Sequence, residues 1–409
     1  MLNVKSSTEV ERIVHSAFGH LRTGVESVDL LASLGRILAS DIVADQYVPT
    51  FDRSTVDGYA VRASDTFGAS FAIPAILPCM DGTPIGGQPE PLISGQCQYV
   101  PTGGEIPQGA DAMVMIEDVE DFGDGMRYVM SPTAPGRYIS FMGDDVSPGK
   151  IVMQAGRKIR PQDIGTLAAL GIQNVDVHVK PVVSILSTGD ELVEIHASPE
   201  NAQIRDVNTY TLSAGVTSSG AESVRYGIIK DDYSLIKASM INALRDSDML
   251  LISGGSSVGT LDLARQVIDE LVTQYEDSRV LLHGIAIKPG KPTLIASIQG
   301  KPVFGLPGHP MAAFFMFKLF VGPLIARMMG NKERHLTQNA ILTINIPSNT
   351  GREELVPVRL AEGAGRLQAE PISGKSGLIS ILSEAGGYIR IPRDQEGLLS
   401  NTEVTVYLL

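Results

Sequence analysis

From residue 181 onward, short apolar runs alternate with stretches whose apolar residues recur at helical spacing. The runs at 182–186, 223–229 and 249–252 are short enough for buried strands. Helical patterns lie near residues 208–218, 234–244 and 262–272, and further strands are expected at 293–298 and 302–306. This alternation predicts a doubly wound α/β domain, in which helices cover both faces of a parallel sheet.

A strongly apolar helix is predicted from Met311 to about Met329, where it closes the α/β domain. Its Phe314, Phe315 and Phe317 are expected to pack in the core. After residue 332 the pattern becomes β again, with strands expected at 341–346, 354–360, 388–391 and 403–409.

The N-terminal third has a different pattern. Apolar residues between Val10 and Leu21 recur at helical spacing behind a Thr8-x-x-Glu11 capping box, and a second helix is predicted at about residues 28–39. Residues 51–143 contain recurring glycines and prolines between short β-like runs, which predicts a small β-rich insert. A helix that opens at Pro161 and ends at Gly171, then a strand at 174–180, are expected after it.

Composition narrows the class of protein. A chain of 409 residues with 43% apolar residues predicts about two to four globular domains. No apolar stretch of about 18 residues lacks charges, and the first residues lack the layout of a signal peptide, so a cytoplasmic protein without a membrane span is expected. Cys79 and Cys97 fit a reducing compartment as ordinary small residues. The net charge of −13 disfavours nucleic acid as a partner, yet allows an anionic small molecule where basic groups gather.

A glycine- and serine-rich turn at 253–259 joins one predicted strand to the next helix. Its glycines let the backbone approach a ligand, and backbone N–H groups at a helix start favour an anion such as phosphate. Thr260 stands where a Walker A loop has its lysine, so the turn is not of that type. Taken alone, such a loop is more often a simple tight turn from strand to helix than a ligand site.

Polar loops follow the other predicted strands as well. They are STGDEL at 187–192, KDD at 230–232, KPGKP at 288–292 and PGHP at 307–310. Ligands of doubly wound sheets bind beyond the carboxyl ends of the strands, where carboxylates suit Mg²⁺ and lysines suit an oxyanion. Each loop also has a structural interpretation: Asp190, Asp206 and Asp231 as helix caps, the lysines as a solvated loop, and the prolines as turn formers. No HExxH or CxxC zinc motif is present.

Taken together, these loops resemble the MoeA family and the related E domain of gephyrin. The segments FDRSTVDGYA at 51–60, VPTGGE at 100–105 and GDDV at 143–146 match further family motifs, in the same order along essentially the whole chain. The resemblance implies an elongated four-domain chain of α/β and β parts. It comprises domain I at 1–50 and 144–177, a β-rich domain II at 51–143, an α/β molybdopterin-binding domain III at 178–331, and a C-terminal β-barrel at 332–409.

The activity implied by the resemblance belongs to molybdenum cofactor biosynthesis. Family members take adenylated molybdopterin and molybdate, insert the metal at the dithiolene and release AMP, with Mg²⁺ as the cation. They are homodimers whose cleft joins domain III of one subunit to domains I and II of the other. Transient contacts with the molybdopterin adenylyltransferase and with molybdoenzyme apoproteins are also expected.

The resemblance carries over to individual positions. The catalytic carboxylates it implies are Asp57, Asp145, Glu191, Asp231 and Asp262, of which Glu191, Asp231 and Asp262 are the expected metal ligands. The expected cofactor-binding residues are Thr102, Thr188, Gly189, Asp190, Gly254, Gly255, Ser256, Ser257, Gly259, Lys288, Lys291, Pro307, Pro310 and Arg352. Two departures affect molybdate coordination: His309 stands where the family often has Asn, and Ala312-Ala313 stands where many members have Ser-Ala.

Two other functions fit the same α/β domain. One is a nucleotide hydrolase or amidase like those of the CinA family, against which the DGYA segment and the β insert count. The other is a non-catalytic scaffold that binds molybdopterin, against which the retained carboxylates and lysines count.

Overall fold

The computed structural model describes residues 4–82, 86–254, 260–332, 336–363, 365–372, 374 and 379–409, with backbone alone for residues 260–262. The chain forms two compact units. Unit 1 contains Met1–Ala39, Ala155–Arg160 and Val175–Leu409, and unit 2 contains Ser40–Gln154 and Pro161–Asn174. The boundaries of the four predicted domains remain a prediction.

The main sheet of unit 1 carries the predicted α/β domain. Its strands lie in the order β16 (Glu222–Ile229), β13 (Val182–Thr188), β17 (Met249–Gly254), β21 (Lys301–Leu306), β20 (Leu294–Ile298), β18 (Arg279–His283). Strands β16, β13, β17 and β21 are parallel, as predicted. Strand β20 runs antiparallel to both of its neighbours, β21 and β18, because Gln299 and Gly300 have positive φ and close a two-residue hairpin between β20 and β21.

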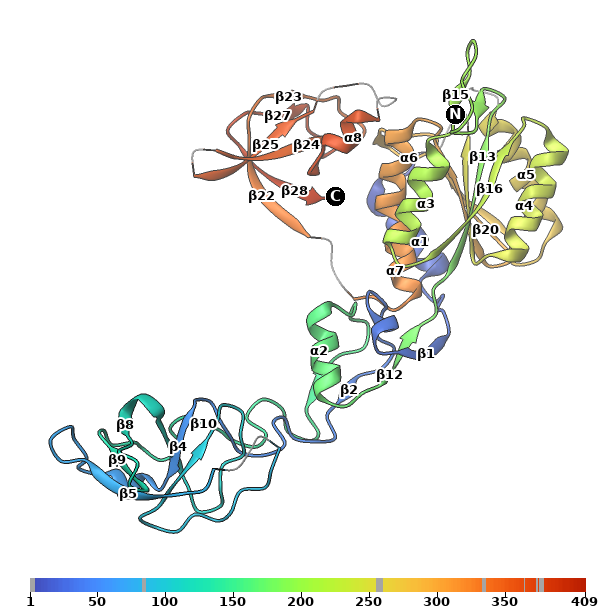
Figure 1. The fold of residues 1–409 in the computed structure, drawn as a ribbon. Helices are drawn as coiled ribbons and strands as arrows, with labels where there is room; N and C mark the ends of the chain where they lie inside the picture. Colours follow the sequence, from blue (N-terminus) through green and yellow to red (C-terminus); the bar gives the residue numbers. More distant parts are fainter. Residues whose placement is uncertain are drawn as a thin grey trace. The chain divides into compact units, whose positions relative to one another are not determined.

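Helices cover both faces of this sheet (Figure 1). On one face lie α4 (Tyr233–Asp246) and α5 (Thr260–Gln274); on the other lie α1 (Ser7–Phe18), α3 (Asn208–Ser218), α6 (Pro310–Met316) and α7 (Gly322–Met328). Alternate residues of β13 separate the two cores, since Leu186 packs with Ile236 of α4 and Ile185 packs with Leu212 of α3. The predicted two-sided packing is therefore confirmed.

The predicted apolar helix runs from α6 through a π-helical turn (Phe317–Val321) into α7. Its 19 residues are long and apolar enough to cross a membrane, but 61% of its most apolar window is buried inside the protein. Phe315 and Phe317 are almost completely buried and Phe314 packs against the same core, as predicted. This helix is the core helix of unit 1.

Two N-terminal predictions are wrong. The capping box of α1 joins Ser6 and Glu9 rather than Thr8 and Glu11, so the helix starts earlier than expected. The predicted helix at 28–39 is instead β1 (Val25–Asp29) followed by a 3₁₀ turn. Gly35 has a φ of +76°, which ends helical geometry, and Ile37 and Leu38 then pair with residues 158 and 177.

The predicted β insert lies in unit 2. Its sheet has the order β7 (Ala112–Met115), β4 (Gly58–Val61), β6 (Cys97–Val100), β5 (Ala75–Met80), β9 (Met126–Val129), β8 (Val119–Glu120). The helix predicted at Pro161 is α2 (Pro161–Ala169). The strand predicted at 174 is β12 (Asn174–His178), which from Val175 onward belongs to unit 1 and pairs there with β1.

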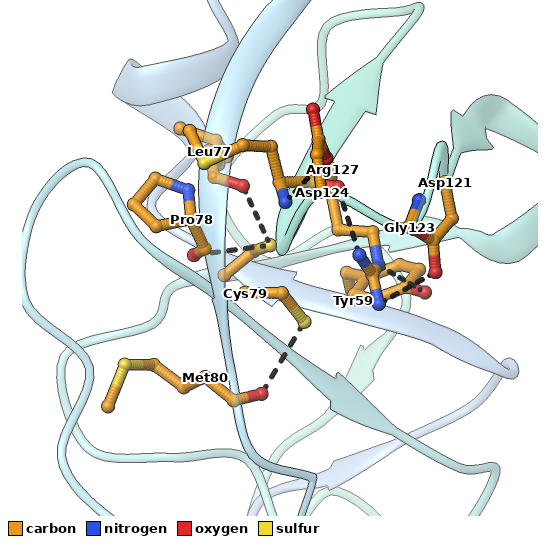
Figure 2. A network of polar contacts seen from close by, with 11 residues as sticks. Tyr59, Leu77, Pro78, Cys79, Met80, Asp121, Gly123, Asp124 and Arg127 are labelled. Carbon is orange, nitrogen blue, oxygen red and sulfur yellow. Dashed lines mark hydrogen bonds and ion pairs between the residues drawn. The ribbon is translucent and has the colours of Figure 1, made fainter.

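The chain's two cysteines face each other in this insert. Cys79 and Cys97 are direct partners on the parallel strands β5 and β6, and both are free thiols. The Cys97 thiol donates to the carbonyl oxygens of residues 77 and 78, and burial raises its pKa to about 12, with Cys79 adding to the shift. Beside them, Arg127 binds the Tyr59 hydroxyl at 2.9 Å and the Asp121 carboxylate at 2.8 Å (Figure 2).

The C-terminal sheet has the order β19 (Ile287–Lys288), β24 (Glu353–Gly363), β25 (Arg366–Pro371), β22 (Thr337–Leu342), β28 (Glu403–Leu408), β26 (Gly387–Ile391). A further pairing between β24 and β26 closes the sheet into a barrel, as predicted. Tyr388 of β26 packs edge-on against Phe315 of the core helix, with ring centroids 5.2 Å apart. Short elements complete the chain: β2 (Ile42–Val43), β3 (Arg53–Ser54), β10 (Ile139–Ser140), β11 (Ile151–Met153), β14 (Leu192–Val193), β15 (Ile204–Arg205), β23 (Ile346–Pro347), β27 (Gly397–Leu398) and α8 (Ser380–Glu384).

Candidate active site

The carboxyl ends of the parallel strands meet at one edge of the main sheet. Thr188, the last residue of β13, is in register with Ile229 of β16 and with Gly254 of β17. Leu294, which follows the KPGKP loop, pairs with Gly305 near the end of β21. The polar loops that were predicted to share an edge therefore do so.

A buried hydrogen-bond network holds the start of α3 at this edge. Asp206, which is 3% exposed, accepts hydrogen bonds from the Ser187 hydroxyl at 3.1 Å and from the backbone N–H of Thr209 at 3.0 Å. Asp206 is thus a helix cap. Asp231 is not, because its neighbour Asp232 accepts the capping hydrogen bond from α4.

Asn208 ties three of the loops together, a role that its sequence context did not indicate. Its amide nitrogen donates to the Ser253 hydroxyl at 2.7 Å and to the Gly308 carbonyl oxygen at 2.8 Å. Asn208 and Ser253 are buried, so these hydrogen bonds fix the loop after β21 against the end of β17. The signal available in the sequence was a polar residue two positions after the capping Asp206.

Three buried polar atoms at this edge lack a hydrogen-bond partner among the described residues. They are Thr188 Oγ1, Asn208 Oδ1 and Asp231 Oδ1. An unsatisfied buried polar atom costs about 1–3 kcal/mol, so three near the same strand ends are expensive to keep. Their common position points to a polar ligand that satisfies them.

Carboxylates crowd the end of β13 and β16. The Asp190 carboxylate accepts the backbone N–H of Asp231 at 3.2 Å. Burial, followed by the charges of Asp190 and Glu191, raises the pKa of Asp231. Gly189 has a φ of +149°, and a Cβ there would lie 2.7 Å from Glu191 Oε2, so glycine is required for Glu191 to fold back over the turn. This part of the edge carries excess negative charge.

The KPGKP loop presents two lysines in different ways. Lys288 lies on β19 and forms a 2.7 Å ion pair with Glu354 of the neighbouring strand β24. Lys291 is exposed and forms no ion pair with any described residue, while its carbonyl oxygen accepts the backbone N–H of Ile285 at 2.9 Å. Gly290 has a φ of +129° and packs against Met316, which fixes the loop.

The remaining predicted site residues of unit 1 are two prolines, one exposed arginine and a set that lies outside the described residues. Pro307 is buried and Pro310 opens α6, so both shape the turn before the helix. Arg352 is exposed beside β24. Gly255, Ser256, Ser257 and Gly259 lie outside the described residues, as does the side chain of Asp262.

The predicted site residues of unit 2 include one close pair. The Asp57 carboxylate accepts the backbone N–H of Thr102 at 2.8 Å, and both residues are exposed. Asp145 is also exposed, and its backbone bonds with Val48 and Lys150. Unit 2 therefore offers exposed carboxylates on loops that are held by backbone hydrogen bonds.

Three sequence profiles match successive parts of the chain. They are the MoeA N-terminal region (domain I and II) at residues 5–171, a probable molybdopterin binding domain at 184–327, and the MoeA C-terminal region (domain IV) at 339–409. The molybdopterin molybdenumtransferase of Bacillus subtilis is 33% identical over 416 residues, covering 100% of this chain and 96% of that protein. The chain belongs to the MoeA family.

Two further relatives are similar to this chain over most of its length. The molybdopterin molybdenumtransferase of Haemophilus influenzae is 33% identical over 332 residues, covering 81% of this chain and 80% of that protein. The crystal structure of the molybdopterin biosynthesis MoeA protein from Pyrococcus horikoshii OT3 covers 100% of both chains at 34% identity, with a TM-score of 0.86. The predicted family, multidomain fold and place in molybdenum cofactor biosynthesis are confirmed.

Proposed function

We propose that this MoeA-family chain inserts molybdate into adenylated molybdopterin and releases AMP. The observation that carries the proposal is the set of unpartnered buried atoms of Thr188, Asn208 and Asp231 at the carboxyl edge of the sheet. A pterin nucleotide has hydrogen-bond donors and acceptors that can satisfy such atoms, and this edge is where doubly wound sheets bind nucleotides. The curated relatives named molybdopterin molybdenumtransferase support the same reaction.

In the proposed reaction, water attacks the phosphoanhydride between molybdopterin phosphate and AMP, so that a new P–O bond forms as the anhydride bond breaks and AMP leaves. Negative charge develops on the leaving phosphate and must be neutralised. Lys291, whose ammonium pairs with no described carboxylate, is placed on a fixed loop to receive an oxyanion such as molybdate. Lys288 is already paired with Glu354, so it has less charge to offer.

A divalent cation fits the donor chemistry of the β13 and β16 ends. Burial, and then the like charges of Asp190 and Glu191, raise the pKa of Asp231, and a cation at its unpartnered oxygen would relieve that repulsion. No group of three or more His, Cys, Asp or Glu within the described ranges is arranged to hold a metal ion. We assign Asp231 and Glu191, together with Asp262, whose side chain lies outside the described residues, to part of the Mg²⁺ shell, and substrate phosphate to the rest. When bound, Mg²⁺ would neutralise phosphate charge.

The proposal includes a cytoplasmic homodimer in which Asp57, Thr102 and Asp145 act on substrate held by the other copy. A mixture of Asp57→Ala and Asp262→Ala chains should then regain part of the activity, because one of the two sites receives both intact residues. With subunit exchange verified, no recovery would contradict the shared site. Transient contacts with the adenylyltransferase that supplies the substrate and with apoproteins that accept the product are part of the same proposal.

The test is a reaction with purified adenylated molybdopterin, molybdate and Mg²⁺, in which AMP and inserted molybdenum are both measured. We expect AMP release in step with metal insertion. Thr188→Val removes the unpartnered hydroxyl with little change of shape and should slow both readouts, whereas the exposed Thr217→Val on α3 should not. AMP release without insertion would indicate a nucleotide hydrolase, and binding without either readout would indicate a scaffold.

A further inference from the structure

A second candidate site lies in unit 1, away from the strand ends described above. An open pocket of about 830 Å³ is lined by the C-terminal end of α3, by the core helix and the residues that follow it, and by the segment Ala155–Arg160. Its lining contains six basic side chains: Arg22, Lys158, His178, Lys318, Arg327 and Lys332. No aspartate or glutamate of the described ranges lines it, although the whole chain has a net charge of −13.

Basic residues often collect at helix C-termini to bind the last carbonyl groups, so that explanation comes first. Only Arg22 fits it, through hydrogen bonds to the Gly19 and Leu21 carbonyl oxygens at 2.9 and 2.6 Å. The carbonyl groups that end α3 and α7 already accept backbone N–H groups from the residues after each helix. Helix capping therefore does not occupy the other basic side chains.

The charges of this cavity also lack partners. Lys158, Lys318, Arg327 and Lys332 form no ion pair with a described residue. Burial lowers the pKa of Lys318, because no anion offsets the loss of water around its ammonium. Four cations that share one cavity repel one another, and an anion between them would remove that cost.

His178 supplies an independent sign of a ligand. Its Nδ1 is buried and has no hydrogen-bond partner among the described residues. A Cβ on Gly330, which has a φ of +69°, would lie 3.0 Å from His178 Nε2, so the glycine lets the ring pack closely at this wall. His178 therefore adds to the lining of this pocket an imidazole with one unsatisfied nitrogen.

We propose that this cavity binds a small molecule that carries two or more phosphate groups. Its volume lies within the range of about 300–1,000 Å³ that is typical of small-molecule sites. Several separate cations match a ligand with more than one anionic group better than a single phosphate. A neighbouring pocket of about 550 Å³ shares Lys318 and Arg327 and is also lined by Glu11, Tyr388 and Tyr407.

The experiment measures binding of inorganic pyrophosphate and of ADP to the full chain by calorimetry. It uses a Lys288→Ala, Lys291→Ala background, so that the oxyanion site of the proposed reaction does not contribute. Saturable binding of either probe is expected, and a preference for ADP would identify a nucleotide as the source of the phosphates. Binding of neither probe overturns the inference.

The matched variants are Lys158→Gln with Lys332→Gln inside the cavity, and Arg366→Gln on the exposed surface of β25 as the control. Each lost charge-assisted contact should weaken binding by about tenfold or more, while the control binds as before. Unchanged binding in the cavity variant would show an adventitious ion only. Equal unfolding midpoints show that the variant folds.

Measuring AMP release distinguishes this second site from the site of the proposed reaction. The cavity variant, made in the parent chain, should release AMP at the parent rate. Loss of AMP release would mean that the cavity belongs to the substrate site, which would overturn its assignment as a second site. Failure of the molybdenum reaction itself would leave the pyrophosphate result unaffected.

Discussion

Replacing Asn208 with alanine separates stability from function at the strand ends. The substitution removes the two hydrogen bonds to Ser253 and Gly308, each of which contributes about 0.5–1.5 kcal/mol, so about 1–3 kcal/mol is lost. It also removes the unpartnered Oδ1, whose burial costs about 1–3 kcal/mol. The two effects oppose each other, and the free energy of unfolding should change by no more than about 2 kcal/mol.

The effect on substrate should be larger. A ligand at one hundred times its Kd stabilises the folded protein by about 2.7 kcal/mol, and a tenfold weaker Kd reduces this to about 1.4 kcal/mol. If Asn208 Oδ1 accepts a hydrogen bond from adenylated molybdopterin, the alanine variant should show that reduction. Urea unfolding with and without the substrate measures both quantities in one series.

Two results would refute this reasoning. A loss of more than about 3 kcal/mol without substrate would mean that Oδ1 is satisfied in the free protein. Equal stabilisation by substrate in both proteins would mean that Asn208 does not contact it. Asn208→Asp serves as a comparison: it keeps an oxygen but loses the amide donor and adds charge, so it should be less stable than the alanine variant.

Three further predictions address other parts of the chain. Lys291→Ala should raise the molybdate concentration for half-maximal insertion by about ten- to a hundredfold, and an unchanged molybdate titration would make the loop structural. Cys97 should alkylate far more slowly than Cys79 at pH 8, because a pKa of about 12 leaves only about one thiolate in ten thousand; peptide mass analysis should show its rate rising about tenfold per pH unit and reaching that of Cys79 on unfolding. Arg390→Met should lower the unfolding free energy by about 3–5 kcal/mol, because it leaves the mostly buried Glu353 carboxylate without its cation. Replacing Glu353 with Gln in the same chain should recover much of that loss, and no recovery would place the defect in packing.

The sequence predicted the elements whose pattern depends on neighbouring residues. Apolar runs located β13, β16 and β17, and the Phe315 and Phe317 core, because burial of a periodic face requires no knowledge of the partner. The prediction of a helix at 28–39 was wrong because the positive φ of Gly35 and the pairing with residues 158 and 177 determine the conformation of that segment. Helical spacing alone contains neither fact.

The candidate site was predictable in position but not in detail. Strand ends followed by polar loops indicated the edge of the sheet, and the register of Thr188 with Gly254 agrees. The pairing of Lys288 with Glu354 was not visible, because it depends on β19 joining a strand 66 residues further along the chain. The unpartnered oxygen of Asn208 depends on which amide atom faces the buried network, and no sequence pattern encodes that choice.

The division of the chain between its two units has a consequence for synthesis on the ribosome. The chain passes from one unit to the other four times, and Val10, Val14 and Phe18 of α1 are buried in the same core as Leu324 of α7. Roughly 300 residues separate these helices, so at about 5–20 residues per second the apolar face of α1 waits about 15–60 s for its partner. During that time the nascent chain presents an unpaired apolar helix near its N-terminus. A chaperone that holds this segment should therefore raise the yield of folded protein more than one that acts after release.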